Sequence, residues 1–176
     1  MRIAAHGILA DLPPGWEAAI RAEPAEVGPL RAGAAGPPAA PHTPPPAPPH
    51  AADPDTFAVA HFATFALPAT RDDFGAQAVE QMQTTDAFVA LLEYAAEEAD
   101  SALFASQGLP RRLNPHAFSP RQLQRTLAGQ AGFQWFFNEG GRAFCLYVVL
   151  GDAGDTHRLV RKVEQVLTAL AIEVRR

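Results

Sequence analysis

Six histidines and one cysteine are the first side chains of this sequence to consider for metal binding or nucleophilic catalysis. The histidines are His6, His42, His50, His61, His116 and His157. None of them stands at the spacing from another histidine, a cysteine or a carboxylate that zinc motifs require. The sequence also contains no nucleophile elbow and no recognisable catalytic triad. We therefore expect no metal, no cofactor and no catalytic residue.

His61 is the histidine that the pattern places among apolar residues. It shares one side of a predicted strand with Val59 and Phe65. A general base needs partner groups within hydrogen-bond distance, and the sequence identifies none for His61. We favour a hydrogen-bonded structural histidine over a general base.

Cys145 lies in an apolar run between Phe144 and Leu146. A nucleophilic cysteine needs a polar, electropositive and accessible setting, so we expect Cys145 to be a buried small hydrophobic residue. A lone cysteine cannot form an intramolecular disulfide, which fits a reducing compartment. The apolar stretch within the first eleven residues is too short for a signal-peptide core or a membrane span. We therefore expect a cytoplasmic protein.

Glu93 and Arg142 are charged residues in otherwise apolar surroundings. If both lie within the sheet, they can pair across it. Alternatively, each stands at a strand end and faces water. The sequence leaves both interpretations open.

The composition is that of one ordinary domain. The chain has 176 residues, of which 48% are apolar, enough to bury a core. Its net charge of −5 argues against binding to nucleic acid, which a basic stripe would favour. Residues 72–100 contain acids and no base, whereas residues 111–125 contain four arginines and no acid. We interpret these stretches as solvated and partly neutralising each other; the alternative is that one forms a docking face.

Residues 23–55 form a Pro/Ala-rich insertion with eleven of the seventeen prolines. This composition cannot bury enough apolar surface to offset its ordering entropy, so we expect disorder. The proline run at 44–49 should adopt polyproline II. We favour a plain spacer over a ligand for an aromatic groove.

The N-terminal part predicts a hairpin of the domain within residues 1–22. Residues 2–11 suggest a strand, Leu12-Pro13-Pro14-Gly15 a turn, and residues 16–22 a second strand with clean alternation. After the insertion, residues 57–67 predict a long strand.

The middle of the sequence is less regular. Apolar residues at helical spacing predict a short helix over 74–82. Residues 87–94 alternate as a strand but also fit a helix beginning after Asp86, and we favour the strand. Residues 95–125 predict a long irregular excursion, interrupted by several glycines and prolines.

The C-terminal part has the clearest pattern. Residues 133–150 predict a β-hairpin with a Gly-rich turn, and its second strand is apolar on both sides, so we expect it to be central and covered. A helix with one apolar stripe follows to about Leu170, and Ile172 and Val174 suggest a last strand. Together these elements predict one α+β domain, a mostly antiparallel sheet with the C-terminal helix on one face, of which 56–176 is the larger part.

This order of elements resembles that of the PsbP-like α/β/α sandwich superfamily. The likeness lies in Leu12-Pro13-Pro14-Gly15-Trp16 after a first strand, the strand 57–67, the hairpin 133–150 and the helix 157–170. A Leu-Pro-x-Gly-Trp turn opens many bacterial members, including DcrB-like and LpqN-like proteins. The resemblance implies a non-enzymatic protein that binds proteins, assemblies or small ligands, and it carries over no catalytic residue. Many members are exported lipoproteins, whereas this sequence has no lipid-accepting cysteine near its start.

We therefore predict an interaction or accessory protein of a larger bacterial assembly, with a protein partner and no role for nucleic acid or membrane. Its candidate contact surface lies on the excursion, because long irregular segments on a rigid sheet often bind partners. The residues are Leu109, Arg111, Arg112, Phe118, Arg121 and Arg125. One alternative is a small-molecule binder or unrecognised hydrolase with a pocket near His61, Trp135 and Tyr147. Another is a structural protein that pairs through an exposed strand edge.

Overall fold

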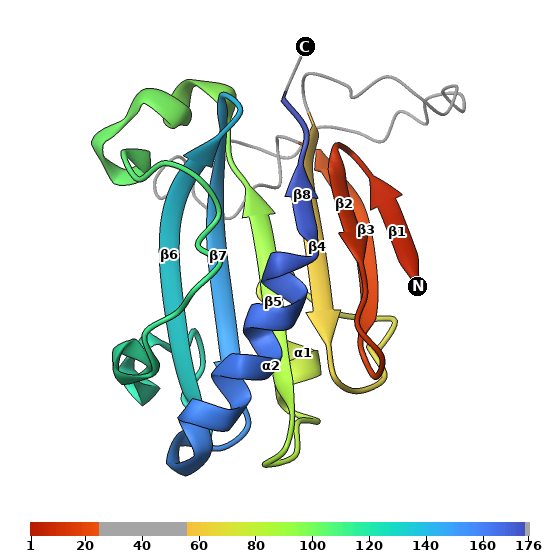
Figure 1. Ribbon diagram of the computed structural model, residues 1–176, viewed down its shortest axis with the longest axis vertical. Helices are drawn as coiled ribbons and strands as arrows, with labels where there is room; N and C mark the ends of the chain where they lie inside the picture. Colours follow the sequence, from red (N-terminus) through yellow and green to blue (C-terminus); the bar gives the residue numbers. More distant parts are fainter. Residues whose placement is uncertain (25–55, 175–176) are drawn as a thin grey trace, which may run out of the picture.

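The computed structural model describes residues 1–24 and 56–174, so most of the predicted insertion 23–55 lies outside the described residues. The fold is α+β, as expected, with two antiparallel sheets and a C-terminal helix (Figure 1). Within the described residues, no helix is long and apolar enough to cross a membrane.

The larger sheet has five strands in the order β3-β4-β5-β7-β6. Their bounds are β3 (Glu17–Pro24), β4 (Thr56–Ala63), β5 (Ala87–Glu93), β6 (Ala131–Glu139) and β7 (Arg142–Leu150). Every residue of β5 and β7 is buried, which confirms the strand over 87–94 and the central place of β7. A strand that is apolar on both faces has to be covered on both sides.

The smaller sheet consists of β1 (Arg2–Ala5), β2 (Ile8–Asp11) and β8 (Leu170–Ile172), in the order β1-β2-β8. The expectation of one strand over 2–11, paired with 16–22, is wrong. His6 and Gly7 both have positive φ, 51° and 71°, as a two-residue type I′ turn requires. They divide the segment into the β1–β2 hairpin, and β3 pairs instead with β4 in the other sheet.

The C-terminal elements confirm the predicted hairpin, helix and last strand. Gly140 and Gly141 turn the chain between β6 and β7 with φ of 61° and 73°. Helix α2 (Thr156–Thr168) buries one apolar stripe, formed by Leu159, Val160, Val163, Val166 and Leu167. Strand β8 then adds to β2.

The five-stranded sheet separates two hydrophobic clusters. On one face lie α2 and residues of the small sheet. On the other lie the segment 64–86 with α1 (Ala76–Val79), and Leu123 and Leu127. Figure 1 shows α2 in front of the sheet and α1 behind it. The predicted helix over 74–82 is thus a single turn, and β4 ends at Ala63 rather than at residue 67.

Candidate functional site

The excursion 95–125 pairs with the outer edge of β6 at two points. At the first point, the Asn138 backbone N–H donates to the Ser106 carbonyl and the Asn138 carbonyl accepts from the Gly108 N–H, both at 2.8 Å. At the second, Ser119 and Gly132 exchange two backbone hydrogen bonds of 2.9 and 3.0 Å. The excursion is therefore a belt fixed to the sheet at two points, and it runs along β6 in Figure 1.

The belt contains short 3-10 helices and no α-helix. They are η2 (Ala96–Asp100), η3 (Ala102–Phe104), η4 (Pro115–Ala117) and η5 (Pro120–Gln122). Leu109, expected to be an exposed contact residue, is only 6% exposed and belongs to the core beside α2. Phe118 is half-buried and stacks on Phe133 with ring centroids 5.2 Å apart. Because the belt is hydrogen-bonded to the sheet edge, its apolar side chains can reach the core.

Arg111, another predicted binding residue, holds the end of α2. Its guanidinium donates to the carbonyls of Leu167 and Leu170, and to that of Thr168 at 3.4 Å. A cation at a helix C-terminus satisfies carbonyls that lack intrahelical partners and opposes the negative end of the helix dipole. Arg111 is thus engaged in holding α2 and β8 to the belt.

The other three predicted arginines reach the surface. The Arg112 side chain is 88% exposed and pairs with Glu164 of α2 at 3.1 Å. Arg125 pairs with Glu80, so the acidic and basic stretches of the sequence do neutralise each other at one point. Arg121 is exposed and makes no ion pair with any described residue.

Belt and helix together form a surface that we call the basic surface. It comprises Arg112, His116, His157, Arg158 and Arg161, all of them exposed. Residues 157, 161 and 164 lie on one side of α2, because side chains three or four positions apart are neighbours. That side meets the belt, where the Leu113 N–H donates to Glu164 Oε1 at 3.0 Å.

Two carboxylates lie within the basic surface, and each is bonded to an arginine. Asp155 pairs with Arg158, and Glu164 pairs with Arg112. Arg161 makes no ion pair with any described residue. Three arginines and two carboxylates therefore leave the basic surface a small excess of positive charge, although the chain as a whole carries −5.

Sequence reasoning missed the contribution of α2 to this surface. His116 and His157 are far apart in the sequence, yet their ring centroids lie 5.4 Å apart. The helical periodicity of the sequence indicates only the apolar stripe of this helix. The basic residues at 157, 158 and 161 indicated a positively charged side of the helix. Nothing in the sequence indicated that the belt would lie beside that side.

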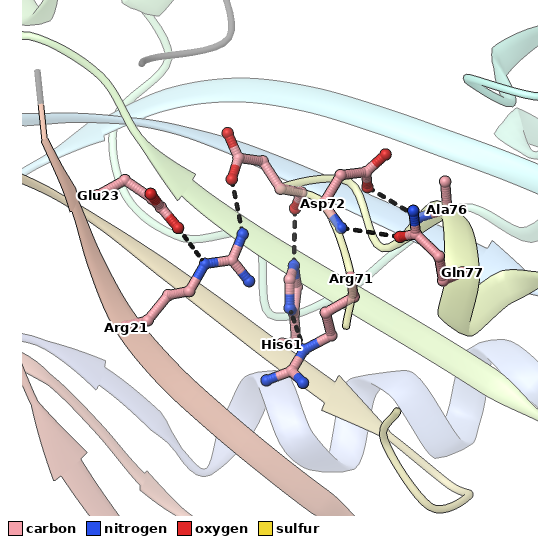
Figure 2. A network of polar contacts seen from close by, with 8 residues as sticks. Arg21, Glu23, His61, Arg71, Asp72, Ala76 and Gln77 are labelled. Atoms are coloured by element: carbon pink, nitrogen blue, oxygen red, sulfur yellow. Dashed lines mark hydrogen bonds and ion pairs between the residues drawn. The ribbon is translucent and has the colours of Figure 1, made fainter. Parts of the chain in front are cut away.

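His61 belongs to a separate polar network on the opposite face of the sheet (Figure 2). Its Nε2 bonds to the Asp73 carbonyl at 2.7 Å, and its Nδ1 accepts from Arg71 Nε at 2.9 Å. The carbonyl requires a donor, so the proton is assigned to Nε2. Burial lowers the pKa of His61 to about 4. Both ring nitrogens are therefore occupied on a neutral ring, which favours the structural role.

The rest of the network fastens the segment after β4 onto the sheet. Arg21 of β3 pairs with Glu23 and, at 2.7 Å, with Asp73. Arg71 donates to the Pro68 carbonyl at 2.5 Å. Burial also raises the pKa of Asp73. The network thus binds three elements together: two strands and the loop that crosses them.

The side chains of the predicted pocket do not converge. Tyr147 is buried in the same cluster as Cys145, and its hydroxyl accepts from the Gln124 N–H at 3.0 Å. Trp135 is 42% exposed and is registered opposite Leu146, so it faces the other side of the sheet. His61 and Tyr147 are core residues here, and Trp135 lies apart from both.

Cys145 is buried, as predicted. Gln134 Nε2 donates to its sulfur at 3.4 Å. Burial raises the pKa of the thiol to about 11, so the thiolate that a nucleophile requires is disfavoured. Within the described ranges, no group of three or more His, Cys, Asp and Glu residues is arranged to hold a metal ion.

Glu93 and Arg142 do pair across the sheet. Arg142 Nε and Nη2 reach the two carboxylate oxygens at 2.8 and 2.9 Å, and both side chains are buried. Arg142 also donates to the carbonyls of His6, Gly7 and Glu173. The pair therefore joins the five-stranded sheet to the small one.

Comparison of the chain with protein-family models, curated proteins and solved structures finds no match. The resemblance to the PsbP-like superfamily therefore stays a prediction. The site is interpreted from its own geometry.

Proposed function

We propose that this protein is a non-catalytic interaction or accessory protein that docks an acidic segment of a protein partner on the basic surface. The observation that carries the proposal is the convergence of belt and helix, which gathers exposed arginines from both elements around Arg161, a residue without an ion pair among the described residues. Arginine suits this role because its planar guanidinium binds carboxylates through two parallel hydrogen bonds.

The charge distribution supports an acidic partner. Asp72 and Glu80 are exposed acids beside α1, on the opposite face of the sheet. Arg125 neutralises Glu80, so Asp72 contributes the negative charge there. Opposite charges on two faces orient an approaching charged partner and raise its association rate. The rigid support of the basic surface also lowers the entropy lost on binding.

The proposal places the protein in the bacterial cytoplasm, in a larger assembly that involves neither nucleic acid nor a membrane. The buried thiol of Cys145 suits a reducing compartment. The negative net charge opposes general attraction to nucleic acid.

A fluorescent poly-glutamate peptide provides the first test, with the full chain titrated against it and fluorescence anisotropy recorded. We expect the double variant Arg112→Glu/Arg161→Glu to bind at least tenfold more weakly than the original chain at low salt. The single variants Arg112→Glu and Arg161→Glu are each compared with Arg2→Glu, which makes the same change of net charge at an exposed arginine on β1. A loss in Arg2→Glu equal to that in the two single variants would indicate only an effect of net charge and would contradict a localised site.

A further inference from the structure

His116 and His157 form a contact between the belt and the start of α2. His116 lies in η4 and His157 is the second residue of α2. Their rings lie edge to face, with planes at 81° and centroids 5.4 Å apart. Both side chains are exposed to solvent.

The backbones that carry the two rings are held in place. Asn114 Oδ1 accepts from the His116 N–H at 3.0 Å and caps η4. Glu164 accepts from the Leu113 N–H at 3.0 Å and fixes the belt to α2. The two imidazoles are thus presented by fixed elements, while the exposed side chains remain free to rotate on the nanosecond timescale.

This separation matches that of two histidines on one metal ion. A zinc–nitrogen bond is about 2.0–2.1 Å long, so the rings of two histidines on one ion stand roughly 5 Å apart. In the observed edge-to-face arrangement the in-plane nitrogen lone pairs of the two rings do not point at one position. Binding one ion therefore requires at least one of the two exposed side chains to rotate about its side-chain bonds.

We propose that His116 and His157 form a two-ligand site for a divalent transition metal of the Cu²⁺, Ni²⁺ and Zn²⁺ class. Imidazole nitrogen is a preferred ligand of these ions and a poor one for Mg²⁺. The remaining coordination positions are open to water or to a donor from a bound partner. This inference does not depend on the docking of an acidic segment.

The surrounding charges set the strength of the site. Arg158 and Arg161 of α2 and Arg112 of the belt oppose a bound cation, whereas Asp155 and Glu164 favour it. Both carboxylates are bonded to arginines, so the local field offers the ion little attraction. The affinity for the metal ion therefore comes mainly from the two imidazoles, and replacing either histidine should abolish most of that affinity.

Calorimetric titration of the full chain with Cu²⁺, Ni²⁺, Zn²⁺ and Mg²⁺ tests the proposal. We expect affinity to be highest for Cu²⁺ and to be absent for Mg²⁺. His116→Gln and His157→Gln should each weaken Cu²⁺ binding at least tenfold. His6→Asn is the matched control, because His6 is exposed in the β1–β2 turn and asparagine tolerates its positive φ. Unchanged binding in both Gln variants, or equal loss in the control, would overturn the assignment.

Thermal unfolding provides an independent readout. An ion that bridges belt and helix stabilises the folded chain by mass action, so Zn²⁺ should raise the Tm of the original chain. It should leave the Tm of His157→Gln almost unchanged. An equal increase in His157→Gln would place the metal elsewhere and refute the two-histidine site.

Discussion

A few buried polar residues attach the neighbouring elements to the two faces of the large sheet. Glu93 and Arg142 are buried as a bidentate pair, and three backbone carbonyls use the remaining donors of the guanidinium. Charges in an apolar core are tolerated only when paired and hydrogen-bonded in this way. The sequence raised the possibility of this pair, since both charges interrupt apolar runs. It did not indicate the contacts of Arg142 with residues 6, 7 and 173, which depend on tertiary structure.

His61 should make the stability of the protein depend on pH. Its pKa is about 4 in the folded chain and about 6.5 when unfolded. The unfolded chain therefore binds more protons between these values, so the free energy of unfolding should fall as the pH drops from about 6.5 to 4. The full loss is roughly 3 kcal/mol. Above pH 7 the contribution is fully present.

Urea unfolding of the original chain and of His61→Gln at pH 7.5, 6.0 and 5.0 checks this prediction. The variant should start less stable because its network is altered, and the difference between the two proteins should shrink as the pH falls. Parallel curves at all three values would show that His61 does not carry the pH dependence.

At the scale of elements, the belt and α2 hold each other in place. Arg111 joins them through carbonyls of the last helical turn and of β8. The prediction of Arg111 as a partner-binding residue arose from its charge alone. A sequence does not reveal that a helix end, distant along the chain, lies within reach of that charge.

Arg111→Ala should lower the free energy of unfolding by about 1–2 kcal/mol, since carbonyls at the helix end lose a charged donor. Arg111→Lys should recover only part of this, because an ammonium group cannot reproduce the planar fork of donors. Arg112→Ala is the matched control: its side chain is mostly exposed, so the loss should stay below about 1 kcal/mol. Equal effects of Arg111→Ala and Arg112→Ala in urea unfolding would contradict the anchoring role.

At the scale of the whole molecule, local patterns were predicted well and distant pairings were not. The hairpin β6–β7, strand β5 and helix α2 follow from alternation, turn residues and helical periodicity within short windows. The N-terminal strands were misassigned because the turn at His6 and Gly7 divides residues 2–11 into two strands and because β2 pairs with β8 at the other end of the chain. Of the basic surface, only Arg112 was among the predicted contact residues. Arg158, Arg161 and the two histidines could be assigned to it only from the fold.

The charge distribution is also a property of the whole molecule. A chain with net charge −5 carries a surface of opposite sign where belt and helix meet. This arrangement favours one orientation of an acidic partner over others. The proposed partner-binding role and the proposed metal-binding pair both lie on this surface, but each has its own test.

Affinity capture from the native host, with bound proteins quantified by mass spectrometry, tests the central claim most directly. The full chain would be compared with Arg112→Glu/Arg161→Glu, with Arg2→Glu, and with a variant in which a short Gly/Ser linker replaces residues 25–55 and leaves β3 intact. We predict a specific protein that the full chain, Arg2→Glu and the linker variant retain and that Arg112→Glu/Arg161→Glu loses. Retention of the same proteins by Arg112→Glu/Arg161→Glu, or their loss only in the linker variant, would contradict docking on the basic surface.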